Sequence, residues 1–420
     1  MKAKNKKWYK LDNAAKIFPP NENKLDPKVF RFACELYEIV DKEILQHALD
    51  KTLEEYPVFR SSLKKGLFWY YLETSSVKPF VTEENKTLCE KINKDLLFRV
   101  FYYKNRISLE VNHALTDGTG TLLFLKSLVT NYLIKKHNIK SKIVIDNTSI
   151  YEKEDDSFEK YYKKSNNIEI PKGKRAYTLK GEMYPERQLK VIEGTVSTDK
   201  IKELAKSHNT TVTAYLASIL IKSIGQTMSL KAKRKPVIIT IPVNLRKYFK
   251  SNTVRNFFNT ITLEYKFEDN NDKLEQIIES VDKQLKENLT KEKLSAQMNA
   301  LAVLENVFVI RLVPLFIKDI VLKYFHKQSR KEQTIALSNI GIVEMPEKLR
   351  EYIKLFDVFA STDSTQICMC SYLDNMTLSF TTHFVESEIE KNFFKELSDK
   401  EIEVEINTNI VEDDDYEEVL

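Results

Sequence analysis

The sequence is poor in cysteine, and it lacks the apolar runs that span membranes or direct secretion. Its four cysteines, Cys34, Cys89, Cys368 and Cys370, form neither a disulfide framework nor a zinc-binding spacing, which is typical of a reducing compartment. The basic N-terminus is followed by charged residues and not by an apolar segment, so no signal peptide is predicted. We therefore expect a cytoplasmic protein.

A strong excess of charge of either sign is also missing. Lysine and arginine total 66 against 61 acidic residues, which gives a net charge of +5. Basic clusters such as residues 231–235 are short and typical of solvated surfaces, so we expect no nucleic-acid partner. With 42% hydrophobic and 30% charged residues, the composition indicates a globular protein that can bury a large core.

Glycine is scarce as well, and its distribution singles out one short segment. Two of the eight glycines, Gly118 and Gly120, follow Asn-His-Ala-Leu-Thr-Asp at residues 112–117. Apolar residues alternate with polar ones over 107–112, as in a strand, and recur with helical spacing over 117–136. His113 is therefore predicted to end a strand just before a helix, whose N-terminus suits the Asp117 carboxylate.

An imidazole at such a turn can act as a general base, because its ordinary pKa of about 6.5 leaves it largely neutral at pH 7. The sequence has no Gly-x-Ser-x-Gly elbow, no cysteine beside His113 and no His-Glu-x-x-His motif. His113 would then deprotonate the substrate's own hydroxyl, amine or thiol, without a covalent enzyme intermediate. The alternative is a surface histidine on an ordinary turn, and the neighbouring Asp117 and Gly118 favour the base.

His113-x-x-x-Asp117-Gly118 resembles the HxxxDG motif of the chloramphenicol acetyltransferase-like acyltransferases, which include alcohol acetyltransferases and the condensation domains of nonribosomal peptide synthetases. Asn112 stands where condensation domains usually have a first histidine, Asn256 replaces a glycine, and the Asp-Phe-Gly-Trp-Gly signature of the plant branch is absent. The bacterial alcohol acetyltransferase-like group is the nearest fit. Three further segments resemble the superfamily in the same order: Tyr-Pro-Val-Phe-Arg-Ser-Ser-Leu (56–63), Ile-Pro-Val-Asn-Leu-Arg (241–246) followed by Arg-Asn-Phe-Phe-Asn-Thr (255–260), and Leu-Ser-Asn-Ile-Gly (337–341).

The resemblance implies a role for each matching residue. His113 would take the proton from the acceptor as the acceptor attacks a thioester carbonyl. Asp117 would hold the catalytic loop by pairing with an arginine, for which Arg60 is the first candidate and Arg246 the second. Gly118 would let the pantetheine arm of the donor approach the backbone. Further candidates, for lining the tunnel or stabilising the oxyanion, are Ser338, Asn339, Arg246 and Asn259.

From the resemblance we expect an enzyme that moves an acyl group from acyl-CoA to a small alcohol acceptor, with the coenzyme A thioester as co-substrate and no metal. Two alternatives stay open. One is a condensation or polyketide-associated acyltransferase whose donor is held by an acyl or peptidyl carrier protein. The other is a family member that binds a lipid or a partner without catalysis.

The resemblance also implies two chloramphenicol acetyltransferase-like lobes with a tunnel between them, whereas periodicity alone predicts a mixed α/β (α+β) fold. We predict an N-terminal lobe at 1–150, a crossover linker at 151–185, a C-terminal lobe at 186–408 and an acidic tail at 409–420. Gly225 is expected to end a helix at 211–224. The predicted strands are 67–73, 96–103, 106–112, 187–197, 237–243, 257–265, 334–340, 367–372 and 376–383, and the other helices are 41–55, 117–136, 199–207, 272–288 and 387–397.

Residues 299–325 are rich in Leu, Val, Ile and Phe, but charged residues and Pro314 interrupt them, so a membrane-spanning helix is not predicted. Two interpretations stay open. We favour a buried helix pair that lines the tunnel. The alternative is a helix at a membrane interface that collects lipophilic substrates, so membrane contact is allowed but not favoured.

Overall fold

The structure is a computed structural model that describes residues 7–84, 87–140, 143–163, 173–185, 188–267, 272–306 and 311–410. Its strands form a five-stranded sheet of order β12-β2-β7-β6-β5, a seven-stranded sheet of order β10-β9-β11-β13-β14-β8-β15 and a small sheet of order β1-β4-β3. The strands are β1 (Trp8–Lys10), β2 (Val29–Leu36), β3 (Ser61–Lys65), β4 (Tyr70–Thr74), β5 (Val81–Glu83), β6 (Phe98–Tyr103), β7 (Arg106–Asn112), β8 (Lys190–Ser197), β9 (Val237–Asn244), β10 (Phe258–Tyr265), β11 (Ile335–Ile342), β12 (Ile353–Ala360), β13 (Gln366–Tyr372), β14 (Asn375–Thr382) and β15 (Glu405–Thr408).

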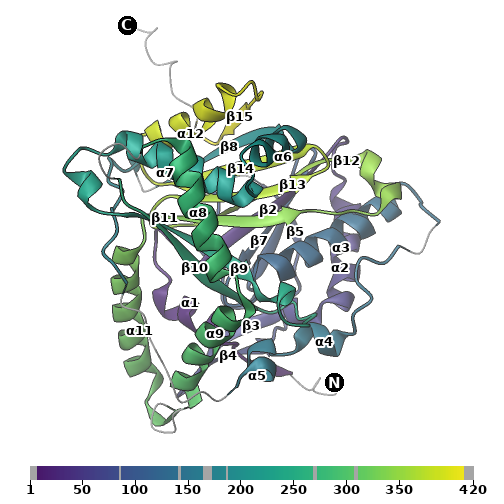
Figure 1. Cartoon of the computed structure of the whole chain (residues 1–420). Coiled ribbons are helices and arrows are strands. Elements are labelled where there is room, and N and C mark those ends of the chain that lie inside the picture. Colours follow the sequence, from purple (N-terminus) through teal and green to yellow (C-terminus); the bar gives the residue numbers. More distant parts are fainter. Residues whose placement is uncertain are drawn as a thin grey trace, which may run out of the picture.

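Helices pack against each of the two large sheets (Figure 1). They are α1 (Phe18–Asn21), α2 (Lys42–Glu55), α3 (Gly118–Lys136), α4 (Ile150–Glu154), α5 (Ser157–Tyr161), α6 (Thr198–Ser207), α7 (Val212–Thr227), α8 (Leu274–Asn288), α9 (Lys291–Asn306), α11 (Leu315–Ser329) and α12 (Glu388–Ser398). The predicted mixed α/β class is confirmed.

The five-stranded sheet and the pair α2 and α3 enclose one hydrophobic core. The Asp41 side chain accepts a hydrogen bond from the Ile44 N–H and so begins α2. Leu45, Ala48 and Leu49 lie on one face of this helix and are fully buried. A second core lies between the seven-stranded sheet and the helices α7, α8 and α12.

One strand crosses between the two halves of the chain. β12 pairs antiparallel with β2, with Phe30 opposite Ala360 and Leu36 opposite Ile353. The division at 1–150 and 186–408 stays a prediction, but a strand of the second range thus belongs to the sheet of the first. Residues 164–172 of the predicted linker and residues 411–420 of the predicted tail lie outside the described part of the chain.

The predicted end of a helix at Gly225 is wrong, because α7 continues to Thr227. A β-carbon at Gly225 would lie 2.3 Å from Cζ of Phe267. The glycine therefore serves close packing of α7 against this ring, which helical periodicity cannot distinguish from a stop signal.

The favoured interpretation of residues 299–325 as a buried helix pair is wrong for α11, whose side chains Phe316, Ile320 and Tyr324 are exposed. Residues 307–310, and the side chains of 301–306, lie outside the description. Pro314 does interrupt the segment, immediately before α11. Among the described residues, no helix is long and apolar enough to cross a membrane.

Candidate active site

His113 lies in the turn between the last residue of β7 and the first residue of α3. Its N–H donates to the carbonyl oxygen of Lys28 at 2.8 Å. Its own carbonyl oxygen accepts a hydrogen bond from the Asn256 amide at 3.1 Å. The turn is thus held on one side by the residue before β2 and on the other by the segment before β10.

Aromatic rings enclose the imidazole of His113. The ring of Phe18 stacks on it with centroids 4.6 Å apart, and those of Phe30 and Phe258 lie 4.3 and 6.4 Å away. Its Nδ1 is buried and has no hydrogen-bond partner among the described residues. Burial lowers the pKa of His113 from 6.5 to about 4, against the opposing charges of Asp26 and Asp117. The imidazole is therefore neutral at pH 7.

Asp117 is the N-cap of α3, and both of its carboxylate oxygens are bound. Oδ1 accepts from the Gly120 N–H at 3.0 Å, and Oδ2 accepts from the Phe257 N–H at 2.8 Å. The guanidinium of Arg246 donates to Oδ2 at 2.8 Å and to Oδ1 at 3.2 Å. This bidentate pair is buried and ties the HxxxDG turn to the strands β9 and β10.

The arginine that pairs with Asp117 is therefore Arg246, the second candidate, and the first candidate Arg60 is wrong. Arg60 is exposed at the end of a short 3₁₀ helix, η2 (Pro57–Phe59). Arg246 is further fixed because its Nε donates to the Thr253 carbonyl oxygen at 2.9 Å. Both arginines lie in segments that resemble the superfamily, at 56–63 and 241–246. Only the tertiary arrangement shows which of them reaches the Asp117 carboxylate.

A cavity of about 690 Å³, here called the central cavity, lies beside His113 between the two large sheets. β9 and β11 pair only over Ile335 opposite Ile239 and Ala336 opposite Thr240, and residues further along both strands line the cavity. The five-stranded sheet contributes Phe30, Phe32, Val358, Phe359 and Ala360, and the other walls include Gly118, Thr119, Thr213, Asn244, Lys247, Phe258, Lys286, Ser338, Asn339, Ile340 and Cys368.

The predicted oxyanion candidates occupy different positions. Ser338 and Asn339 both line the central cavity. The Asn339 amide donates to Oγ1 of Thr213 at 2.8 Å, and its Oδ1 accepts from the Gly341 N–H at 2.8 Å. Asn259 lies on β10 and donates to Gln297 of α9 at 3.0 Å. Of the four candidates, Ser338 and Asn339 are thus the two that line the central cavity.

The two glycines of the HxxxDG turn have different roles in packing. A β-carbon at Gly120 would lie 2.0 Å from the Val254 carbonyl oxygen, so a side chain cannot fit there. A β-carbon at Gly118 would lie 3.0 Å from Cδ1 of Ile340 and would narrow the central cavity. The missing side chain at Gly120 therefore permits the close approach of the turn to Val254. The missing side chain at Gly118 leaves the central cavity wider beside Ile340.

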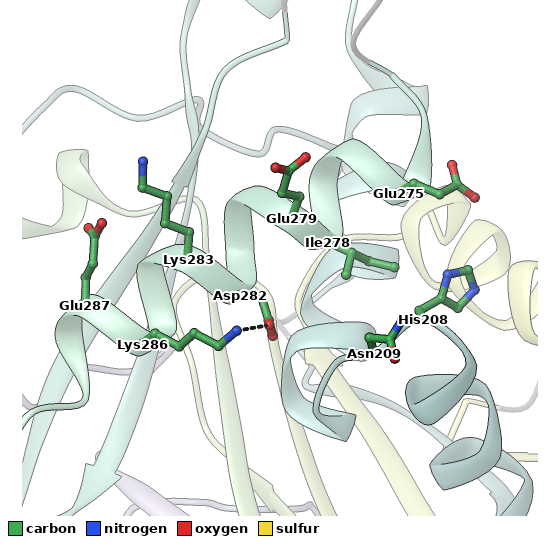
Figure 2. Close-up of a pocket in the computed structure, with 9 residues that line it drawn as sticks. All are labelled: His208, Asn209, Glu275, Ile278, Glu279, Asp282, Lys283, Lys286 and Glu287. Carbon is green, nitrogen blue, oxygen red and sulfur yellow. Dashed lines mark ion pairs between the residues drawn. The ribbon is translucent and has the colours of Figure 1, made fainter.

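A hollow of about 560 Å³, here called the charged groove, adjoins the central cavity at α8 (Figure 2). Asp282 and Lys286 line both and form an ion pair of 3.0 Å. Thr210 donates to Asp282 at 2.5 Å. Four more charged residues of α8 line the groove, namely Glu275, Glu279, Lys283 and Glu287.

The sequence did not single out the aromatic enclosure of His113. Phe18 lies in α1, which lacks any motif, and Phe30 lies in β2, a strand that periodicity did not predict. In the sequence, Asn256 stands out only as a departure from a glycine, although its amide donates to the carbonyl oxygen of His113 and to Oδ2 of Asp12, the latter at 3.3 Å. The asparagine in place of the family's glycine is the signal in the sequence that points to this position.

Comparisons with known proteins agree with the fold described above. The alcohol acetyltransferase family model matches residues 157–382, just over half of the chain. No curated protein matches the sequence significantly.

Several solved structures share the two-lobed fold over nearly the whole chain. TRI3 trichothecene 15-O-acetyltransferase from Fusarium sporotrichioides is 12% identical, with a TM-score of 0.63 and coverage of 93% of this chain and 95% of that one. The first condensation domain of the calcium-dependent antibiotic synthetase, in complex with a substrate analogue, is 11% identical (TM-score 0.63; 95% and 99%). TRI101 from F. sporotrichioides, in complex with coenzyme A and T-2, is 10% identical (TM-score 0.60; 95% and 99%).

Proposed function

Since the chain belongs to the alcohol acetyltransferase family, we propose that it transfers an acyl group from acyl-CoA to an alcohol, with His113 as the general base. The observation that supports this most directly is the neutral imidazole of His113 in the wall of the central cavity between the two sheets. A neutral imidazole can accept a proton, whereas an imidazolium cannot.

The reaction we propose has no covalent enzyme intermediate. The acceptor hydroxyl gives its proton to His113 while its oxygen forms a bond to the thioester carbonyl carbon. The resulting oxyanion collapses, the carbon–sulfur bond breaks, and the departing thiolate takes the proton back from His113. Ser338 would donate a hydrogen bond to the oxyanion, and such donors are worth about 10²–10³ in kcat.

A cysteine thiol also lies in the wall, and it is unsuited to nucleophilic catalysis. Cys368 lines the central cavity, but burial raises the pKa of its thiol to about 12. Because the thiolate is the reactive form of cysteine, this side chain is a poor nucleophile at neutral pH. Direct attack by the acceptor, assisted by His113, is the simpler path.

The donor we propose is a coenzyme A thioester, and the TRI101 structure holds coenzyme A. Gly118 would let the pantetheine arm approach the turn, because a β-carbon there would further narrow the space beside Ile340. Lys247 and Lys286 are cations in the wall of the central cavity and would meet the phosphates of the donor outside the acyl site.

The experiment measures the release of free coenzyme A from acetyl-CoA and longer acyl-CoAs with a panel of alcohols and amines. We expect acceptor-dependent release in the wild type and a fall of about 10²-fold or more in His113→Ala. The matched control is His137→Ala at the opposite end of α3, where the imidazole stacks on Tyr352 at 3.9 Å. The control should retain wild-type turnover.

The outcomes separate the alternatives. Equal loss in His113→Ala and His137→Ala would remove the case for His113 as the base. Release only from an acyl or peptidyl carrier protein would replace coenzyme A as the donor. Saturable acceptor binding without release from either donor would indicate a protein that binds without catalysis.

A further inference from the structure

One face of α11 presents a continuous row of large apolar side chains to solvent. Phe316, Ile320 and Tyr324 follow one another at intervals of four residues, and each is at least 60% exposed. Ile317, Val321 and Phe325 extend the same surface. We call these six residues the α11 face. Isolated exposed apolar residues are common, but a contiguous set on one element marks an interaction surface.

The opposite side of α11 is firmly attached to the small sheet. Nζ of Lys318 lies 3.4 Å from the centroid of the Trp69 ring and donates to the Phe68 carbonyl oxygen at 3.1 Å. The Tyr70 hydroxyl donates to Asp319 at 2.9 Å. The buried side chain of Leu315 completes this contact. The α11 face is therefore held outward by a fixed helix.

The charged side chains that α11 exposes beside the apolar row are basic. The single acidic residue of the helix, Asp319, is turned inward, where it also meets Lys65 at 3.7 Å. Lys323 and Lys327 are exposed next to the apolar row. If a second copy of the chain packed on this face, Lys323 and Lys327 would be buried at the interface. The facing α11 has no outward carboxylate that could pair with them. Anionic lipid headgroups above an acyl phase complement both features.

The α11 face also lies close to the candidate active site. α11 stands at the edge of the molecule beside α1 (Figure 1) and packs against it. Phe18 of α1 stacks on the His113 ring at 4.6 Å. The helix α11 is thus connected to the wall of the central cavity through one short helix, α1.

We propose that the α11 face is a membrane-docking surface. It lies in the plane of a bilayer that contains anionic lipid, with its apolar row at the boundary between headgroups and acyl chains and with Lys323 and Lys327 at the phosphates. Docking of this kind does not require a spanning helix. It also does not depend on which acyl donor or acceptor the enzyme uses.

The test is flotation of the full chain with vesicles of phosphatidylcholine, alone or mixed with phosphatidylglycerol. We expect the wild type to float with the mixed vesicles, less with phosphatidylcholine alone, and less at high salt. Ile320→Glu should lower the vesicle partition coefficient by about tenfold or more. Leu230→Glu is the matched control, because Leu230 is 88% exposed outside the α11 face and should float as the wild type does.

Circular dichroism and thermal unfolding would show that both variants are folded. The proposal is overturned if the wild type does not float with either vesicle, or if Ile320→Glu and Leu230→Glu float equally. It is also overturned if sedimentation velocity shows a wild-type dimer that Ile320→Glu dissociates, because the occupant of the face would then be a second copy.

Discussion

Replacing Arg246 with methionine should destabilise the protein strongly, because it leaves the Asp117 carboxylate buried without its counterion. The Asp117 and Arg246 side chains are 7% and 9% exposed, and two N–H···O contacts join them. Removing one partner of such a pair costs about 3–5 kcal/mol. This is a large fraction of the roughly 5–15 kcal/mol that stabilises a typical folded protein.

The assay is urea unfolding followed by circular dichroism, with Arg60→Met as the control. Arg60 is exposed at the end of η2, so its replacement should change the free energy of unfolding by no more than about 0.5 kcal/mol. Equal effects of Arg246→Met and Arg60→Met would refute the reasoning.

A double-mutant cycle isolates the pair itself. Asp117→Asn combined with Arg246→Met should cost clearly less than the sum of the two single changes, because both remove the same interaction. If the two changes in the free energy of unfolding simply added, the carboxylate and the guanidinium would not stabilise each other, even though the structure places them in contact.

Three further predictions concern the site. The acid limb of kcat/KM should lie near pH 4, because burial lowers the pKa of His113 to that value and activity requires the neutral ring; Phe18→Ala should move the limb toward 6.5, and an unchanged limb would show that the stacked Phe18 does not set it. Gly120→Ala should prevent stable folding, since its β-carbon would lie 2.0 Å from the Val254 carbonyl oxygen, whereas Gly118→Ala should keep the melting temperature and raise KM for the donor; equal melting temperatures for the two variants would contradict this distinction. Ser338→Ala should lower kcat by about 10²–10³ with little change in melting temperature, and unchanged turnover would remove Ser338 from the mechanism.

The local parts of the site could be predicted from the sequence because local periodicity encodes them. Alternation over β7 and helical spacing over α3 place His113 and Asp117 correctly at the turn between them. Helical spacing of apolar residues likewise predicts the helices α2 and α8. The acyltransferase fold followed from the order of the short motifs, and the comparisons agree with it.

The missing parts depend on contacts between distant segments. No pattern within 56–63 or 241–246 says which arginine meets Asp117, because the choice depends on how β9 lies against α3. Phe18 encloses His113 only after α1 has packed against the turn between β7 and α3. The exposed row on α11 has the composition of a buried helix, and only its placement at the edge of the molecule reveals the difference.

The pairing of β12 with β2 has a consequence for synthesis on the ribosome. β2 leaves the exit tunnel long before β12, the strand that pairs with its open edge, because β12 lies more than 300 residues further along the chain, at Ile353–Ala360. Until that segment emerges, the edge of β2 is a template for any other extended chain. The five-stranded sheet of the nascent protein therefore stays incomplete until β12 has been synthesised, and a truncated chain that ends before β12 would leave this edge of β2 permanently unpaired.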